Sequence, residues 1–202
     1  MKKRAAIFAS GSGTNLENIA KKVKAGELSC DIVTVVCDNP GALALKRAEK
    51  FGLESFLIER KNFKSKTEFE NKITEHLKQK KVDVVLLAGY MRILSPEFVR
   101  SWPGKVLNVH PSLLPQYPGA HAIKDAYEAK EKETGVTIHF VTEEVDAGPI
   151  ILQRRVPIEA NDTLETLEAR VHAAEYELYP EAIGLYCDGK LTIENTKVKI
   201  SR

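Results

Sequence analysis

The sequence predicts an α/β fold, a single Rossmann-like domain whose mostly parallel central sheet is flanked by helices. Over the first 110 residues, short apolar runs alternate with helical patterns, which is the order that builds parallel sheets with crossover helices. Two of these runs, residues 32–37 and 82–88, are apolar almost throughout, as strands covered on both faces are. A hairpin and a long helix are expected to complete the domain, which has no internal repeat.

Each element of the first half has its own signal. The strand at residues 5–9 is compact and apolar, and Gly26 ends the helix that follows it. Ser65, with Glu68 three residues later, marks the start of the third helix as a capping box. The expected strands of this half are residues 5–9, 32–37, 55–58, 82–88 and 106–109, and the expected helices are residues 16–25, 42–51, 66–80 and one that begins at 95–97.

The second half is expected to contain a hairpin and two helices. Residues 134–141 alternate in the manner of an antiparallel or edge strand. An acidic turn that ends in Gly148-Pro149 separates this strand from the next. The expected elements are helices at residues 122–132 and 163–186 and strands at 134–141, 150–156 and 191–193, followed by a polar tail.

Length and charge limit the classes of function. The chain has 202 residues, and its 30 basic and 28 acidic residues give a net charge of +2. No bulk field attracts nucleic acid or a membrane surface, so neither is expected as a partner. Cys30, Cys37 and Cys187 form no C-x-x-C pair and have no histidine at metal-ligand spacing. They are expected to be reduced core residues of a cytoplasmic protein.

No targeting or membrane segment is expected. The basic N-terminus leads into an apolar run that ends after Ala9, which is too short for the apolar core of a signal peptide. No stretch approaches the length of a membrane span. The first apolar run is therefore interpreted as a buried strand.

A glycine-rich turn, residues 10–15, separates the first strand from the first helix. Glycines let backbone N–H groups approach an anion, and the helix dipole favours negative charge, so a phosphate is the expected ligand. A dinucleotide site is the alternative, because Asp38 ends the second strand where a ribose-binding acid would lie. Leu16 occupies the position of the third glycine, and the amide of Asn15 suits one terminal phosphate, which disfavours this alternative.

A strand at residues 106–109 leads into a loop with three prolines. Alternate residues of a strand point to opposite faces, so Asn108 and His110 are expected side by side while Leu107 and Val109 face the core. Open α/β sheets bind ligands at strand exits. This position favours a functional pair over the ordinary alternative of a capping asparagine and a surface histidine.

Four further features have more than one interpretation from the residues alone. The apolar loop that follows the strand at 82–88 suits either core packing or a flat aromatic ligand, and the acidic turn at 142–146 is typical of a solvated hairpin. His139 is interpreted as a strand-face residue in preference to a catalyst. His172 and Glu175 are three residues apart in a helical pattern and therefore share one helical face.

These motifs resemble those of the folate-dependent formyltransferases, and among them the phosphoribosylglycinamide formyltransferases of purine biosynthesis. The resemblance covers nearly the whole chain, through S-G-S-G-T-N-L at 10–16, L-L-A-G-Y-M-R-I-L at 86–94, N-V-H-P-S-L-L-P at 108–115 and D-A-G-P at 146–149. The glycine-rich stretch is the specific part, because methionyl-tRNA formyltransferase and formyltetrahydrofolate hydrolase share the Asn, the His and the distant Asp. The resemblance implies a metal-independent transfer of the formyl group of 10-formyltetrahydrofolate, the cosubstrate, to the amine of 5-phosphoribosylglycinamide.

The resemblance also implies roles for individual residues. The catalytic set would be Asn108, His110 and Asp146. Residues 1–110 would form the phosphate-binding half, with Gly13, Thr14 and Asn15 on the substrate phosphate. Residues 111–202 would form the folate-binding hairpin and the C-terminal helix, with Glu175 on the ribose hydroxyls. The folate would contact Lys66, Met91, Arg92, Ile93, Leu94, Asn108, Thr142, Glu143, Glu144, Val145 and Asp146.

Other implications of the resemblance concern details. The Leu114-Pro115 peptide bond would be cis, and the protein would be a monomer or a homodimer. Lys66 stands where an arginine is usual, and a lysine meets a carboxylate without a bidentate fork. His172 stands where Gln or Lys is usual. The rival functions are a 10-formyltetrahydrofolate hydrolase and a nucleotide or folate sensor without turnover.

Overall fold

The computed structural model describes residues 2–201. They fall into two compact units, which divide between Leu107 and Asn108. The first unit contains alternating strands and helices, and the second contains a hairpin and two helices, as the periodicity of the sequence predicts.

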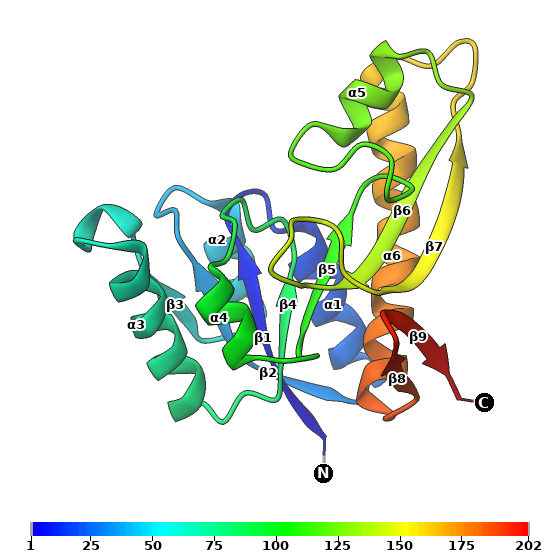
Figure 1. Cartoon of the computed structure of the whole chain (residues 1–202). Coiled ribbons are helices and arrows are strands. Elements are labelled where there is room, and N and C mark those ends of the chain that lie inside the picture. Colours follow the sequence, from blue (N-terminus) through cyan, green and yellow to red (C-terminus); the bar gives the residue numbers. More distant parts are fainter. Residues whose placement is uncertain (1, 202) are drawn as a thin grey trace. The chain divides into compact units, whose positions relative to one another are not determined.

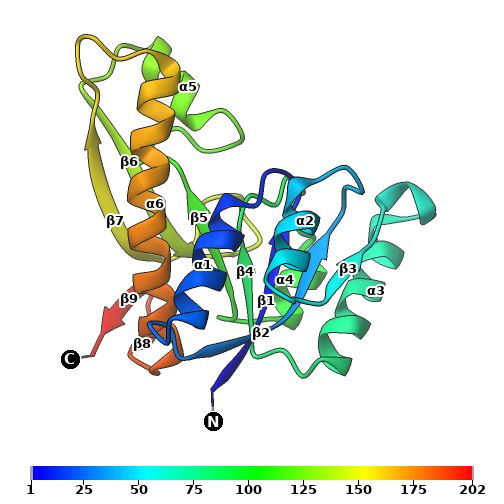
Figure 2. The same cartoon turned by 180° about the vertical axis from the view of Figure 1, so that it is seen from behind.

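The first unit is a parallel sheet covered by helices. Its strands lie in the order β3 (Ser55–Leu57), β2 (Cys30–Cys37), β1 (Lys3–Ala9) and β4 (Val84–Leu87), and every adjacent pair is parallel. Its helices are α1 (Thr14–Lys24), α2 (Leu43–Lys50), α3 (Lys66–Gln79) and α4 (Pro96–Ser101), with a 3-10 turn η1 (Arg60–Asn62). Figures 1 and 2 show α1 and α2 on one face of these strands and α4 on the other.

The central strand explains the continuous apolar pattern. Five consecutive residues of β1, Ala5 to Ala9, are fully buried, because helices cover both faces of the sheet. Small alanines flank the large Ile7 and Phe8 in this strand, which lets the helices approach closely. The loops that follow the carboxyl ends of β1, β2 and β4 are therefore anchored to a closely packed sheet.

The second unit is built on strands β5 (Val106–His110), β6 (Glu133–Phe140) and β7 (Ile150–Pro157), in that order. The chain enters it along β5, whose first two residues belong to the first unit. Strands β6 and β7 are antiparallel, and the long helix α6 (Leu164–Cys187) packs on both of them. Helix α5 (Ala122–Glu128) contacts α6 and β6.

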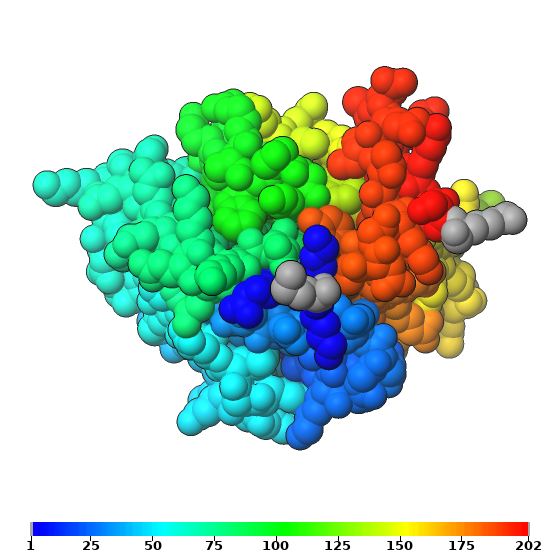
Figure 3. Space-filling view, turned by 90° about the horizontal axis from the view of Figure 1, so that it is seen from below, coloured from blue at the N-terminus to red at the C-terminus, as the bar shows by residue number. Residues whose placement is uncertain are grey.

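The C-terminal tail corrects one prediction. Residues expected to be only a polar tail form strand β9 (Lys197–Ile200), which pairs with β8 (Leu191–Glu194) in a hairpin. Asn195 and Thr196 both have positive φ angles, of 47° and 67°, as the two central residues of a tight hairpin turn require. Figure 3 shows this hairpin, in red, standing out at the surface.

Two smaller differences have local causes. Helix α5 ends at Glu128, before the predicted residue 132, because Lys130 adopts a left-handed conformation with φ of 54°. Strand β6 lies between β5 and β7, so it is a central strand of its unit, whereas its alternating pattern allowed an edge strand. The polar side chains of β6 must therefore make their hydrogen bonds inside the unit.

The structure bears on two general expectations. No helix within residues 2–201 is long and apolar enough to cross a membrane. None of the three cysteines forms a disulfide bond within the described residues; Cys30 and Cys37 are buried as predicted, and Cys187 is half-buried at the end of α6.

Candidate functional site

The glycine-rich turn joins β1 to α1 in a conformation that only glycine adopts easily. Gly13 precedes the first helical residue, Thr14, and has φ of 73°. A Cβ atom on Gly13 would lie 2.7 Å from the Cα atom of Ala44 in α2. The Gly13 position has no side-chain cap, and helix N-termini that begin in this way bind anions in phosphate sites.

Hydrogen bonds tie the loops at the ends of β1, β2 and β4 together. The Ser10 N–H donates to the Gly89 carbonyl at 3.0 Å, and the Asn39 side chain donates to the Ser10 carbonyl at 3.2 Å. The Met91 N–H donates to the Ser10 hydroxyl at 2.9 Å. Three strand ends that are far apart in the sequence therefore form one edge in the first unit.

Asp38 has a different partner from the one that a dinucleotide site requires. Its carboxylate is 8% exposed and accepts a hydrogen bond from Nε of Arg92. A ribose-binding acid must present its carboxylate to the ligand, whereas Asp38 is engaged inside the protein. The structure thus adds to the sequence argument against a dinucleotide.

The predicted folate residues of the first unit lie on two elements, and all but Leu94 are exposed. In the loop between β4 and α4, Met91 and Ile93 are 69% and 63% exposed, whereas Leu94 is buried. Arg92 lies between them, and its guanidinium carbon is 5.8 Å from the centre of the Phe69 ring. Lys66, at the start of α3, is exposed, with its ammonium 4.0 Å from Glu70.

In the second unit, Asn108 extends from β5 to a buried histidine. Its side-chain nitrogen lies 3.1 Å from Nε2 of His139, on β6. Nδ1 of His139 lies 2.9 Å from the Phe140 carbonyl, which can only accept, so Nδ1 carries the proton and Nε2 of the neutral ring accepts from Asn108. Burial lowers the pKa of His139, which is consistent with a neutral ring that fixes the orientation of the amide.

His110 lies at the end of β5 with both ring nitrogens in contact. Nε2 is 2.8 Å from the Tyr117 carbonyl and must donate to it. Nδ1 is 3.5 Å from a carboxylate oxygen of Asp146. Because Nε2 already donates, the Nδ1 contact is attractive only when the ring carries a second proton.

Asp146 connects the histidines. One oxygen faces His110, and the other is 3.7 Å from Nε2 of His139. The Gly119 N–H donates to the Asp146 carboxylate at 2.9 Å. The side chain is 11% exposed, and the backbone has a positive φ of 53°, so this residue of the acidic turn points inward.

The rest of the acidic turn remains at the surface. Glu143, Glu144 and Val145 are exposed or half-exposed, and Thr142 is half-buried, with its hydroxyl bonded to the Glu144 carbonyl at 3.2 Å. A Cβ atom on Gly148 would lie 1.8 Å from the Phe140 carbonyl oxygen. Glycine at this position therefore allows the turn to close onto β6.

The predicted pair on α6 is in contact. Nδ1 of His172 lies 3.0 Å from a carboxylate oxygen of Glu175, and Glu175 is 4% exposed. The hydrogen bond to Glu175 raises the pKa of His172. The structure thus places a buried carboxylate next to a half-exposed imidazole.

The sequence interpretation of His139 as a strand-face residue agrees with its place on β6, but the contacts of its ring with Asn108 and Phe140 were not foreseen. The residue is 1% exposed. The signal was present, because a histidine inside a strand rich in buried apolar residues needs polar partners. The expected cis peptide bond between Leu114 and Pro115 is confirmed.

Comparison with known proteins places the chain in a family. The Formyl transferase family model matches residues 3–183. Phosphoribosylglycinamide formyltransferase of Bacillus subtilis is 42% identical over 181 residues, which cover 90% of this chain and 93% of that protein. The trifunctional purine biosynthetic protein adenosine-3 of Drosophila melanogaster is 44% identical over 95% of this chain, but the chain spans only 14% of that protein.

Solved structures agree with these matches. Glycinamide ribonucleotide transformylase 1 from Symbiobacterium toebii has a TM-score of 0.97 and 40% identity, covering 100% of this chain and 95% of that one. A formyltetrahydrofolate deformylase from Pseudomonas syringae pv. tomato is more distant in sequence, with 27% identity, a TM-score of 0.93 and coverage of 100% and 67%. These likenesses confirm the predicted α/β class with a mostly parallel sheet. The chain belongs to the formyl transferase family.

Proposed function

We propose that this protein is a phosphoribosylglycinamide formyltransferase of de novo purine biosynthesis. It transfers the formyl group of 10-formyltetrahydrofolate to the amine of 5-phosphoribosylglycinamide and releases tetrahydrofolate. The observation that carries this proposal is the cluster of Asn108, His110, His139 and Asp146 in one unit of a formyl transferase. Two of the similar proteins are named phosphoribosylglycinamide formyltransferase and glycinamide ribonucleotide transformylase, and a third is named a purine biosynthetic protein.

The reaction begins when the substrate amine attacks the formyl carbon. The C=O electron pair moves to oxygen and forms a tetrahedral oxyanion, which hydrogen-bond donors stabilise. The second N–H of the Asn108 amide is one donor, since His139 accepts the first. The other donor is Nε2 of protonated His110, which exchanges the Tyr117 carbonyl for the oxyanion.

Asp146 is proposed to orient His110. Its carboxylate faces Nδ1 at 3.5 Å and attracts the Nδ1 proton of the doubly protonated ring that donates to the oxyanion. A water molecule carries a proton from the attacking nitrogen to N10 of the folate. The bond between N10 and the formyl carbon then breaks, which yields the formamide and neutral tetrahydrofolate.

The substrates are held by residues of both units. Gly13, Thr14 and Asn15 bind the phosphate through the start of α1, and Glu175 accepts hydrogen bonds from the ribose hydroxyls. Folate is bound by Lys66, by residues 91–94, by Asn108 and by residues 142–146. Holding two substrates together supplies much of the rate, since such proximity effects reach about 7 to 11 kcal/mol.

No metal takes part in the proposed chemistry, and a cytoplasmic location and a monomeric or homodimeric state are proposed with it. Every step above is assigned to protein side chains, backbone N–H groups and water.

The test is an assay of the purified protein with 10-formyltetrahydrofolate, with and without 5-phosphoribosylglycinamide. Tetrahydrofolate is expected only when the ribonucleotide is present, together with one equivalent of the formylated product. Formate release without an acceptor would instead identify a hydrolase. Folate binding without turnover under both conditions would identify a sensor.

A further inference from the structure

The loop of residues 91–94 exposes apolar side chains although its backbone is well anchored. Met91 and Ile93 are the most exposed large hydrophobic residues among those that the structure describes, at 69% and 63%. Because these two side chains bury little apolar surface, hydrophobic burial contributes little to holding the loop in place. The anchors must come from other interactions.

Three polar anchors from three elements hold this stretch. Ser10, after β1, accepts the Met91 N–H at 2.9 Å. Asp38, after β2, accepts from Nε of Arg92. Glu70, in α3, accepts the N–H of Ser95, the residue that caps α4, at 2.9 Å. The loop is thus fixed at its start, in its middle and directly after its end.

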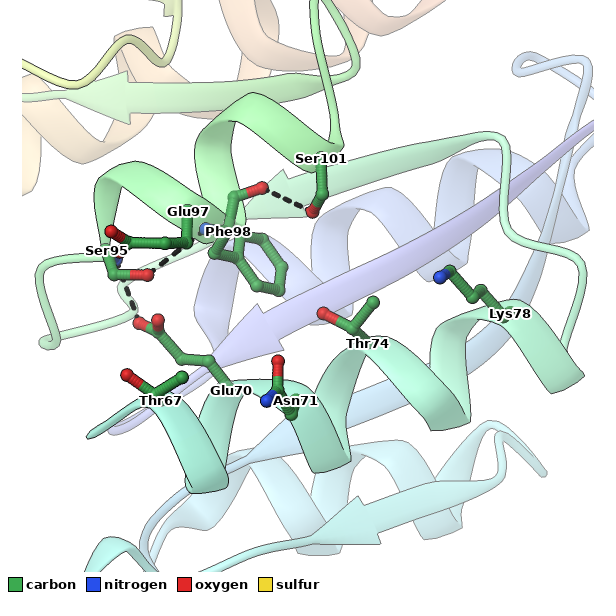
Figure 4. Close-up of a pocket in the computed structure, with 9 residues that line it drawn as sticks. All are labelled: Thr67, Glu70, Asn71, Thr74, Lys78, Ser95, Glu97, Phe98 and Ser101. Atoms are coloured by element: carbon green, nitrogen blue, oxygen red, sulfur yellow. Dashed lines mark hydrogen bonds between the residues drawn. The ribbon is translucent and has the colours of Figure 1, made fainter. Parts of the chain in front are cut away.

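Figure 4 shows how Glu70 reaches this position. Its side chain leaves α3 and points toward Ser95, at one end of a cavity of about 190 Å³ that α3 and α4 line. Oε1 makes the bond to Ser95. Oε2 is buried and has no hydrogen-bond partner among the described residues.

Asp38 shows the same combination of burial and incomplete bonding. Asp38 and Glu70 are 8% and 5% exposed, and Oδ1 of Asp38 also lacks a hydrogen-bond partner among residues 2–201. Burying a carboxylate is costly unless its oxygens are well paired. Two such buried carboxylates lower the stability of the folded protein. Their place beside one loop indicates that they are retained because they fix the position of that loop.

We propose that Asp38 and Glu70 are positioning residues for folate: they hold residues 91–95 in the conformation that receives the cosubstrate before it arrives. The inference rests on the proposed function, in which residues 91–94 contact the folate. A loop that is ordered in advance does not lose conformational freedom on binding, so its anchors strengthen binding without touching the ligand. Because the anchors act on binding, they should change KM for folate more than kcat.

The test uses Asp38→Asn and Glu70→Gln, which keep the size of each side chain and remove its charge. For each variant, KM for 10-formyltetrahydrofolate is expected to rise about tenfold, while kcat and KM for the ribonucleotide change less than about twofold. Asp31→Asn, on the strand β2 that Asp38 directly follows, and Glu75→Gln, on the same helix as Glu70, are the controls, since both acids lie at the surface. The controls should match the wild-type protein.

A second measurement does not depend on turnover. Amide hydrogen exchange of residues 89–95 in the free protein should be faster in both variants, and saturating tetrahydrofolate should restore protection. Exchange in β1 should be unchanged, which separates loop loosening from global unfolding. If either variant is too unstable for kinetics, Ser10→Ala, which removes only a neutral anchor, should show the same exchange pattern with a smaller change.

The outcomes distinguish the two proposals. If wild-type protein neither binds folate nor forms the formylated product, the proposed function fails. If wild-type protein is active but the variants keep the same KM for folate and the same exchange at residues 89–95, only the positioning proposal fails. Equal increases in KM for both substrates would also overturn it, because they indicate general damage.

Discussion

In the first unit the proposed phosphate site depends on the backbone of the glycine-rich turn, whereas in the second unit the proposed catalytic groups are side chains. The glycine-rich turn presents the N–H groups at the start of α1, and the loop of residues 91–94 is fixed in part through its own backbone. In the second unit, Asn108, His110, His139 and Asp146 contact one another through amide, imidazole and carboxylate groups. The first arrangement depends on conformation and the second on chemical identity.

This difference predicts which substitutions matter in each unit. Phosphate recognition by the glycine-rich turn should be sensitive to changes of φ and to added Cβ atoms. Side-chain catalysis should be sensitive to isosteric changes that remove one charge or one donor. The following experiments test that division, from the largest expected effect to the smallest.

Asp146→Asn should cause the largest loss. The shape is kept, but the anion that faces Nδ1 of His110 is removed, so kcat should fall by about 100- to 1000-fold, the scale of losing one oxyanion donor. Steady-state kinetics from pH 6 to 9 measure the effect. Glu133→Gln, an ion-paired surface acid on β6, is the control, and a wild-type rate for the Asp146 variant at every pH would remove Asp146 from the mechanism.

Gly13→Ala should weaken ribonucleotide binding. The residue has φ of 73°, and a Cβ atom would lie 2.7 Å from Ala44, so the turn must shift. Left-handed backbone strain alone costs about 1 to 2 kcal/mol, and KM for the ribonucleotide should rise at least tenfold with KM for folate nearly unchanged. Gly26→Ala, at the other end of α1 with φ of 77° and open space around it, should lower stability without this change in KM.

His139 should make stability depend on pH. Burial lowers its pKa from the usual value of 6.5, so below pH 6.5 the unfolded chain binds a proton that the folded protein resists. Its contribution to the free energy of unfolding is therefore present above pH 6.5 and lost as the pH falls toward the lowered pKa. The full loss is about 1.4 kcal/mol for each tenfold difference in proton affinity between the unfolded and the folded chain. Urea unfolding at pH 7, 6 and 5 should show a shallower loss in His139→Asn than in wild type; parallel curves would mean that His139 is not the group that titrates.

Tyr90→Phe should have the smallest effect and the opposite sign. The Tyr90 hydroxyl is buried without a hydrogen-bond partner among residues 2–201, and burial together with the charge of Asp38 raises its pKa. Its removal should leave the free energy of unfolding unchanged or raise it by about 1 kcal/mol. In the second unit, Tyr127→Phe should instead lower it by about 1 kcal/mol, because that hydroxyl donates to the Asp162 carbonyl at 3.0 Å. Equal losses in the two variants would show that Tyr90 has a partner.

The sequence was most informative where periodicity and chain order carry the signal. The strands and helices of the first unit lie within a few residues of their predicted bounds, since apolar runs, caps and glycines act locally. It failed at β9, where polar residues pair because a two-residue turn brings them back onto β8. It also stopped short at α5, whose end depends on the backbone conformation of a single lysine.

By itself, the sequence determined the alternating α/β order, the glycine-rich turn before α1, and the placement of Asn108 and His110 on one side of β5, because each follows from the spacing of neighbouring residues. Only the tertiary structure decided that Asp38 is paired with Arg92, that His139 orients Asn108, and that Asp146 turns inward to His110. These contacts join residues that lie 31 or more positions apart along the chain. No local pattern specifies such pairings, since they depend on which strand ends and turns the folded chain brings within a few ångströms of one another.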